Sequence, residues 1–408
     1  MAGRARDGLA AWQTPGWAGA PKLISGASGA GLPSFQSAQI FAATVRCVDE
    51  HRRCGDQKVR LFIEGRPVTF ADACERDLLP EANDGDFEAY DRRLRRSHQV
   101  GDFALVVADW HQFDHELWRE ICRAVAEISR SVGVSASRMD TQLFAGSYRK
   151  TPFGVHVDAV NAFQFPLIGK KTMRFWSDEF VQAHPQLKGA RVYHDYLDAS
   201  VAIEAVPGEA VYWPSDAWHI GEGDGALAVT WHFGHWVSPA LQRAAGAALQ
   251  SSLESAGALA MTALPTCTDG ASDLSQLVVQ VVASASEAVR GDAFKQQIVK
   301  YVLEQVSGFG YLRFPAPQGV ESIEPGASVV LREPFRFVWS ECGANLCVAI
   351  AGRSIEFARD AAVLDAIYKL NAAGPVNIDR ISCGGLNRPV VDLLRLGVST
   401  GALEILKA

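Results

Sequence analysis

Two histidines and one aspartate in the middle of the chain have the residue types and spacing of a metal site. The segment Gly154–Asp158 supplies His156 and Asp158 two residues apart, and His219 follows Asp158 by 61 residues, after a Tyr-Trp-Pro turn. Two imidazoles and one carboxylate make up the 2-His-1-carboxylate facial triad, which holds Fe(II) on one face and leaves the other face open. Because a co-substrate and O2 can reach the open face, the three residues predict oxygenase chemistry.

The spacing within the motif also predicts how the ligands are presented. Residues i and i+2 of an extended segment point the same way, so His156 and Asp158 can reach one ion. His219 must then come from another strand that faces them. A chance His-x-Asp pair is common in a chain with ten histidines, so the prediction depends on the third ligand and on the strands around the motif.

Short strands separated by Gly, Pro and Asp fill residues 139–237 and predict a sandwich or jelly roll. The clearest are Thr141–Ala145, Ala162–Leu167, Thr172–Trp176, Ala210–Trp213 and Leu227–Phe233. A cluster of aromatic residues is expected to form the core here, with one or two rings walling the cavity; it comprises Phe175, Trp176, Trp213, Trp218, Trp231 and Trp236.

The rest of the chain predicts flanking domains. Residues 1–99 are expected to pack on a cupin-like catalytic domain at 100–239, which has a helix at 114–132 with apolar residues at helical spacing. The charged stretch 82–97 indicates a solvated connection. Residues 240–310 predict a helical linker, whose helices at 240–306 would suit a homodimer, and residues 311–408 predict a winged-helix-like α+β domain. The fold class is therefore mainly β, with a helical linker and an α+β end.

Composition limits the classes of partner. The formal net charge is −7, and residues 311–408 carry ten basic and ten acidic residues, which argues against a nucleic-acid partner because phosphate contacts dominate such binding. No stretch approaches a membrane span, and no apolar core follows the basic start. The eight cysteines form no C-x-x-C pair. We expect a cytoplasmic protein with free thiols and no membrane partner.

The motifs together resemble the Jumonji-C branch of the cupin superfamily, the Fe(II)- and 2-oxoglutarate-dependent oxygenases. The matching pieces are Gly154–Asp158, the strand at 162–167, the segment 169–176, and Gly208–Pro214 leading into Trp218 and His219. Their order is that of the family. The order of the domains resembles the ribosomal oxygenase subgroup. The resemblance implies a double-stranded β-helix, with Fe(II), 2-oxoglutarate and O2 as cofactor and co-substrates.

The resemblance also implies roles for further residues. Family members hold the distal carboxylate of 2-oxoglutarate with a basic residue after the His-x-Asp motif. Lys171 stands at that place, and Lys170 competes with it because a one-residue shift turns a strand side chain to the other face. His232 either contacts the co-substrate or packs within the sheet. Phe153 occupies a place where Thr is common, and its replacements would be Thr141, Gln142, Gln164 or Thr230.

The substrate is read only from this resemblance, which implies a side chain of a protein or peptide, either a ribosomal protein or the precursor of a natural product. Hydroxylation and demethylation of N-methyl lysine use the same oxidant, so both stay open. Two alternatives are a ligand-sensing cupin regulator that uses the winged helix, and a cupin isomerase or a dioxygenase independent of 2-oxoglutarate. Lys171 argues against this second alternative, the isomerase or 2-oxoglutarate-independent dioxygenase.

Overall fold

The structure is a computed structural model, and it describes residues 19–24, 35–55, 59–135, 137–237, 240–255, 272–310, 314–320, 323, 326–381 and 386–406. These residues group into two compact units: those that fall within 1–238 and 312–316 form unit 1, and those that fall within 239–311 and 317–408 form unit 2. The finer division into four segments at 1–99, 100–239, 240–310 and 311–408 stays a prediction.

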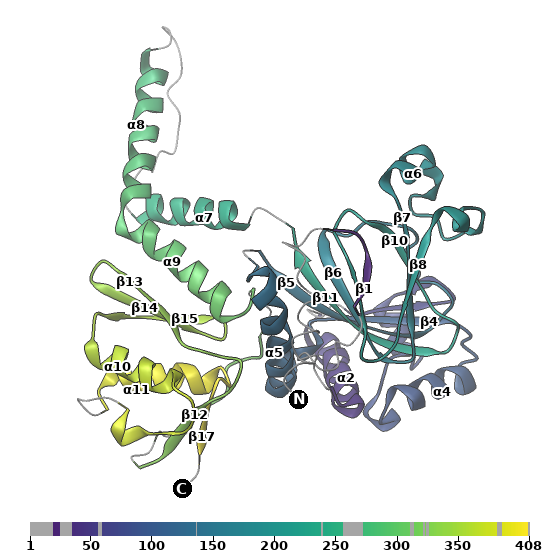
Figure 1. The fold of residues 1–408 in the computed structure, drawn as a ribbon, viewed down its shortest axis with the longest axis horizontal. Helices are drawn as coiled ribbons and strands as arrows, with labels where there is room; N and C mark the ends of the chain where they lie inside the picture. The colour runs from purple at the N-terminus through teal and green to yellow at the C-terminus, as the bar shows by residue number, and fades with distance from the viewer. Residues whose placement is uncertain are drawn as a thin grey trace. The chain divides into compact units, whose positions relative to one another are not determined.

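A large antiparallel sheet forms the centre of unit 1 (Figure 1). Its strands lie in the order β1 (Lys22–Ile24), β9 (Ala210–Trp213), β6 (Val160–Ile168), β11 (Leu227–Trp236), β5 (Met139–Ser147), β4 (Phe103–Ala108), β2 (Val59–Ile63) and β3 (Arg66–Val68). Long apolar strands occupy the middle of this order, and β11 is buried along most of its length. The shorter strands from the first hundred residues extend the sheet at its β2–β3 edge.

A second antiparallel sheet packs on the first. Its strands lie in the order β10 (Trp218–Glu222), β7 (Lys171–Trp176) and β8 (Val201–Ala205). The core that both sheets share contains Val160, Ala162, Val211 and Trp213 from the large sheet and Met173, Phe175 and Ala205 from the small one. Burial of these apolar side chains holds the layers together. The predicted mainly β domain is therefore present.

Helices of unit 1 follow their local sequence signals. They are α2 (Ser37–Cys54), α3 (Phe70–Glu75), α4 (Phe87–Ser97), α5 (His115–Val132) and α6 (Asp178–Ala183), with 3₁₀ turns η2 (Ala82–Asp84), η3 (Trp110–Phe113), η4 (Pro185–Leu187) and η5 (His194–Ala199). Helix α5 begins where Asp114 accepts hydrogen bonds from the backbone amides of Glu116 and Leu117. Its predicted apolar residues Leu117 and Ile121 are fully buried, so this helix is confirmed.

The expectation of a solvated connection at 82–97 was wrong, because this stretch contains α4. It has only three large apolar residues, Phe87, Tyr90 and Leu94, but these lie on one face and are fully buried. The hydroxyl of Tyr90 donates to the carbonyl of Leu78 at 2.7 Å, and Asp86 caps the first turn. A narrow stripe among many charges is enough when the helix packs on a large sheet.

Unit 2 combines three helices with two small sheets. The helices α7 (Ala240–Ser255), α8 (Ser272–Arg290) and α9 (Asp292–Ser307) precede a sheet of β13 (Val338–Cys342), β14 (Asn345–Ile350) and β15 (Arg353–Ala358), and a sheet in the order β16 (Val376–Asn377), β12 (Ser328–Leu331) and β17 (Leu403–Leu406). Helices α10 (Ala361–Asn371) and α11 (Arg388–Ser399) and the turn η6 (Ile378–Arg380) complete it. Leu303 of α9 packs on Cys347 and Ala349 of β14.

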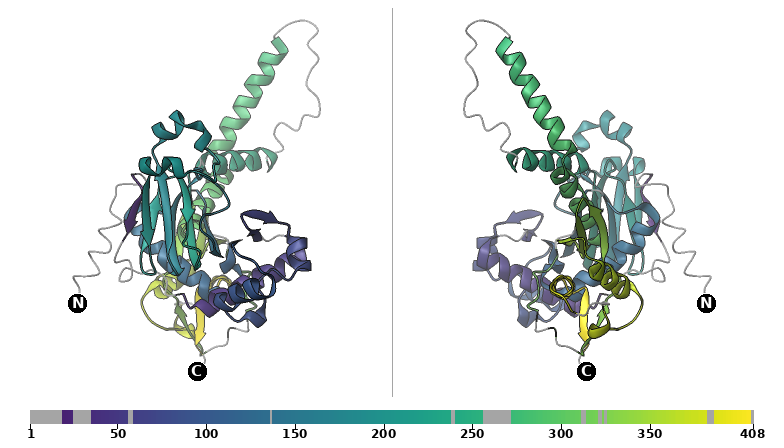
Figure 2. Two further views of the ribbon diagram at one scale, coloured as in Figure 1. Left: turned by 90° about the vertical axis from the view of Figure 1, so that its right-hand side faces the viewer. Right: turned by 90° about the vertical axis from the view of Figure 1, so that its left-hand side faces the viewer.

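Helix α8 projects from the other elements of unit 2 in every view (Figures 1 and 2). Its contacts are with α7 and α9, and several of its valines are exposed. Among the helices that the structure describes, none has both the length and the apolar run that a membrane crossing requires.

Candidate metal centre and its pocket

Main-chain pairing brings the predicted ligands together. The segment that contains His156 runs antiparallel beside β10, and His156 pairs with His219. The amide of His156 donates to the carbonyl of His219 at 3.0 Å, and the amide of His219 donates back at 2.8 Å. Both imidazoles therefore leave the backbone at one level of the sheet, and Asp158 follows two residues later. Residues far apart in the sequence thus meet through ordinary strand geometry.

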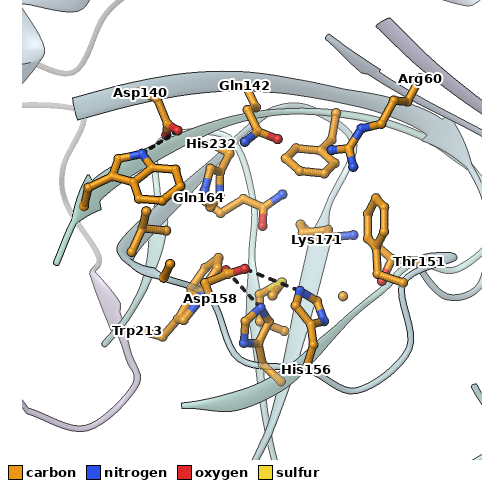
Figure 3. Close-up of a pocket in the computed structure, with 18 residues that line it drawn as sticks. Arg60, Asp140, Gln142, Thr151, His156, Asp158, Gln164, Lys171, Trp213 and His232 are labelled. Carbon is orange, nitrogen blue, oxygen red and sulfur yellow. Dashed lines mark hydrogen bonds and ion pairs between the residues drawn. The ribbon is translucent and has the colours of Figure 1, made fainter. Parts of the chain in front are cut away.

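The three side chains converge as the sequence predicted. The Nε2 atom of His156 lies 3.5 Å from one carboxylate oxygen of Asp158, and the Nε2 atom of His219 lies 3.3 Å from the other. One ligand atom from each residue lies within 4.8 Å of the others. Figure 3 shows His156 and Asp158 at one end of the pocket, pointing toward one another. One carboxylate and two imidazoles at this spacing suit a divalent transition metal.

Hydrogen bonds to carbonyls orient the two imidazoles. The Nδ1 atom of His156 lies 2.9 Å from the carbonyl of Gly154, and the Nδ1 atom of His219 lies 2.8 Å from the carbonyl of Ala217. A carbonyl oxygen only accepts, so each Nδ1 carries the proton and each Nε2 is the nitrogen available to an ion. His219 is buried, whereas His156 and Asp158 are partly open. The site is closed on one side and open on the other.

Asp158 is ionised in this setting. Burial alone would raise the pKa of Asp158, but the close imidazoles of His156 and His219 outweigh burial and lower the pKa well below its ordinary range. The same contact raises the pKa of His156, against burial, which lowers it. The three groups therefore present a negative oxygen between two nitrogens, which is the donor set that a divalent cation prefers.

Gly154 has a backbone conformation that the ligand loop requires. Its φ is +76°, and a Cβ atom there would lie 2.3 Å from the carbonyl oxygen of Gly189. We expect Gly154→Ala to lower the free energy of unfolding by about 2 kcal/mol or more, since strain and a backbone clash add, and to weaken metal binding because His156 shifts. Denaturant unfolding and Co(II) titration measure both effects.

The control for this substitution is Gly225→Ala. Gly225 also has a positive φ, +88°, but a Cβ atom there would meet no atom within 4 Å. This variant carries the conformational strain alone, about 1 kcal/mol, and should bind Co(II) normally. Equal effects of the two substitutions would mean that the contact with Gly189 does not position the ligand loop.

A cavity of about 430 Å³ opens from the ligands between the two sheets. Its walls contain the three ligands with Arg60, Asp140, Gln142, Phe144, Thr151, Phe153, Ala159, Val160, Gln164, Lys171, Met173, Trp213, Gly221, His232 and Trp236. Of the predicted aromatic cluster, Trp213 and Trp236 line this cavity, whereas Phe175, Trp176 and Trp231 are buried in the core. The size suits a small co-substrate together with one substrate side chain.

Lys171 faces the cavity and Lys170 does not. Lys171 begins β7 and is 2% exposed; its Nζ atom donates to the hydroxyl of Tyr148 at 2.8 Å, and no carboxylate of the described residues pairs with it. Lys170 lies outside, where it forms ion pairs with Glu204 at 3.1 Å and Asp224 at 3.7 Å. A buried ammonium without a carboxylate is costly, so its place in a cavity indicates an anionic ligand.

Sequence reasoning missed Thr151 and Tyr148. Thr151 lines the cavity, and its buried hydroxyl has no hydrogen-bond partner among the described residues. Its amide donates to the carbonyl of Gly221 at 2.8 Å, which holds it beside β10. In the family that the chain resembles, a Thr is common at the position of Phe153. In this chain the loop before Gly154 brings the hydroxyl of Thr151 to the cavity instead. A search by residue type over the whole loop would have found it.

His232 lies in a polar row across three strands of the large sheet. In the register it stands opposite Gln142 of β5 and Gln164 of β6, and all three line the cavity. Burial lowers the pKa of His232, so the imidazole is neutral near pH 7. Gln164 donates to Thr230 at 2.6 Å. Thr141 accepts from Trp231 at 2.6 Å and does not line the cavity.

Comparison with solved structures identifies the fold. The X-ray structure of E. coli ycfD matches with a TM-score of 0.53 and 14% identity, covering 97% of this chain and 96% of that one. YcfD, described as a ribosomal oxygenase from Escherichia coli, matches in complex with cobalt and 2-oxoglutarate with a TM-score of 0.53 and 14% identity, over 95% of each chain. The chain has the fold of this ribosomal oxygenase. The predicted resemblance is thus confirmed at the level of the fold.

A further YcfD structure, in complex with cobalt and succinic acid, matches with a TM-score of 0.51 and 15% identity over 95% of each chain. No protein-family model matches the chain, and no curated protein matches its sequence. Sequence identity to YcfD is low, so the comparison establishes a common fold and does not by itself establish a common chemistry.

Proposed function

We propose that the chain is an Fe(II)- and 2-oxoglutarate-dependent oxygenase that hydroxylates a side chain of a protein or peptide, with release of succinate and CO2. His156, Asp158 and His219 would hold the metal. Lys171 would bind the distal carboxylate of 2-oxoglutarate, and His232 would contact the co-substrate or the substrate from the sheet.

One observation carries this proposal: a three-residue metal site and a buried, carboxylate-free ammonium face the same cavity. A 2-oxo acid with a second carboxylate is a ligand that needs both, since one end chelates a metal and the other needs a charge-assisted hydrogen bond. The unpartnered hydroxyl of Thr151 adds a donor beside Lys171 (Figure 3). That YcfD was solved with cobalt and 2-oxoglutarate and with cobalt and succinic acid supports this assignment.

The residues of the chain have separate tasks in this chemistry. When bound, Fe(II) with O2 and 2-oxoglutarate supplies the oxidising power for attack on a C–H bond. His156 and His219 present Nε2 atoms whose direction is set by their Nδ1 hydrogen bonds. Lys171 and Thr151 orient the co-substrate. Trp213 lies against His219, with ring centroids 5.0 Å apart, and excludes water from the buried side.

Anaerobic titration followed by turnover tests the proposal. The full chain should bind Co(II) or Fe(II) and then 2-oxoglutarate with one site each, and admission of O2 to the Fe(II) form should release succinate. Candidate peptides that accelerate succinate release are then analysed by mass spectrometry. A gain of one oxygen indicates hydroxylation, whereas loss of a methyl group with formaldehyde indicates demethylation. A chain that binds neither metal nor 2-oxoglutarate would end the proposal.

The helical part of unit 2 supports a homodimer as a second element of the proposal. Val278, Val279, Val282 and Val289 of α8 are between 43% and 67% exposed, and no charged residue occurs from 274 to 286. An uncharged apolar face of this kind is typical of a contact between subunits. A second copy of the same helix offers a matching surface.

Light scattering tests this contact. We expect the wild type to be a dimer at micromolar concentration and Val279→Lys combined with Val282→Lys to be a monomer, because two buried charges oppose association. The control, Val192→Lys with Val201→Lys, changes two equally exposed valines of unit 1 and should stay dimeric. A monomeric wild type would contradict this part of the proposal.

The winged-helix assignment for residues 311–408 also stays a proposal, and no observation favours the regulator that would use it. Helix α11, which such a regulator would use for recognition, has two basic residues, Arg388 and Arg395, and both lie within 4 Å of Asp392. Because both basic side chains of this helix pair with an aspartate of the same helix, the helix has little free positive charge to bind DNA phosphates. Salt-sensitive binding of duplex DNA by the full chain would favour the regulator instead.

A further inference from the structure

The proposed function gives no role to Arg60, a charged side chain that lines the cavity. His156, Asp158 and His219 take the metal, and Lys171 takes the distal carboxylate of the co-substrate. Asp140 accepts from the indole of Trp236 at 2.7 Å and pairs with Arg138 at 3.2 Å. Arg60 alone has neither an ion pair nor a side-chain hydrogen bond among the described residues, although it lines the cavity.

The strand register places Arg60 on the cavity side of the sheet. Arg60 of β2 stands opposite Val106 of β4, which stands opposite Phe144 of β5, and Phe144 lines the cavity. Figure 3 shows Arg60 and Asp140 at opposite ends of this wall, with Gln142 between them. Arg60 therefore lies in the cavity wall formed by the large sheet, at the end opposite Asp140.

Aromatic contact restrains the guanidinium of Arg60. It lies 5.4 Å from the ring centroid of Phe153 in a cation–π arrangement, and Phe153 in turn lies 6.1 Å from His156, centroid to centroid. Arg60 is thus one aromatic ring away from a metal ligand. Although part of the side chain is exposed, burial lowers the pKa of Arg60. Arg60 is therefore a partly desolvated cation without an ion-pair partner among the described residues, and such groups are typical of binding sites.

We infer that Arg60 is a specificity-determining residue that binds a carboxylate of the substrate beside the carbon to be oxidised. A guanidinium presents two parallel N–H donors that match a carboxylate, and Arg60 is a cation of the cavity that neither the metal nor the distal carboxylate of the co-substrate uses. The carboxylate belongs either to an acidic side chain of a peptide or to a peptide C-terminus. This inference rests on the proposed function and adds the charge of its substrate.

Peptide pools that differ only in charge test the inference with the full chain, Fe(II) and 2-oxoglutarate. One pool contains Asp and Glu with an amidated C-terminus, and a matched pool contains Asn and Gln instead. A third is the Asn and Gln pool with a free C-terminal carboxylate, and a fourth contains Lys with an amidated end. Succinate release above the peptide-free rate is measured for each pool.

With the wild type, succinate release should be about tenfold or more higher with one of the two carboxylate pools than with the amide pool, as expected for a charge-assisted pair. The pool that responds identifies the source of the carboxylate. Arg60→Gln should abolish the preference, and Arg60→Glu should transfer it to the Lys pool. Arg66→Gln, an exposed arginine of the neighbouring strand β3 that does not line the cavity, should behave as the wild type.

Two results would overturn the inference. The first is a wild type that binds metal and 2-oxoglutarate and releases succinate but responds to the four pools alike. The second is an Arg60→Gln variant whose KM for 2-oxoglutarate rises while its choice among the pools is unchanged, since Arg60 would then serve the co-substrate. Failure of the wild type to bind 2-oxoglutarate at all would instead end the proposed function, so the two failures are distinguishable.

Discussion

Asp158→Ala should reduce 2-oxoglutarate-dependent turnover by about a thousandfold or more, because it removes the anionic ligand of the proposed three-residue metal site. The carboxylate of Asp158 lies between His156 and His219, so its loss leaves two neutral nitrogens and no charge to hold a divalent ion. Co(II) affinity, measured by titration without O2, should fall in parallel with succinate release. A loss of turnover with unchanged metal affinity would assign Asp158 a different task.

Asp195→Ala is the matched control. Asp195 is also next to a histidine, with its carboxylate 3.4 Å from His194, but its side chain is 81% exposed. Screening by water makes such a pair weak, so this variant should bind Co(II) and turn over as the wild type does. If Asp158→Ala kept turnover within tenfold of the wild type, the His-Asp-His site would not be the catalytic centre.

Lys171→Met should raise the KM for 2-oxoglutarate by about a hundredfold or more with little loss of stability. Methionine keeps the unbranched apolar part of the side chain and removes the charge, so the distal carboxylate would enter a cavity without its cation. Because the ammonium has no carboxylate partner among the described residues, its removal costs the folded protein little and relieves an unpaired buried charge. Steady-state kinetics and thermal unfolding separate the two effects.

Lys170→Met distinguishes this role from a general effect of charge. Lys170 is next in the chain but exposed, and it pairs with Glu204 and Asp224 on the surface. Its substitution should change the KM for 2-oxoglutarate by less than about twofold. The opposite pattern, in which Lys170→Met raises KM and Lys171→Met does not, would mean that the co-substrate lies elsewhere.

The convergence of the three candidate ligands could be predicted from the sequence because the motifs that carry them are local. A His-x-Asp motif before a strand, a third histidine after a turn and alternating apolar strands are each legible from residue types at short spacing. The order of the motifs favoured Lys171 over Lys170 as the residue that binds the co-substrate. The structure places Lys171 in the cavity wall, and its role in binding stays a prediction. These features depend on neighbours within a few residues.

Other parts of the site depend on distant segments and could not be read in advance. Arg60 reaches the cavity only because β2 and β4 extend the large sheet beyond β5. Thr151 reaches it because an irregular loop pairs with β10. Helix α4 could not be predicted because its three buried residues stabilise it only through packing on the large sheet. In each case long-range packing, rather than local pattern, decides the outcome.

The reciprocal amide-to-carbonyl pairing of His156 with His219 has a consequence for the apoprotein. The separation of the two imidazoles is fixed by the polypeptide backbone, so most of the entropy lost in gathering ligands is lost on folding rather than on ion uptake. The ion-free enzyme is then a preorganised receptor, and chelators should strip it to an inactive but native state that recovers activity without refolding.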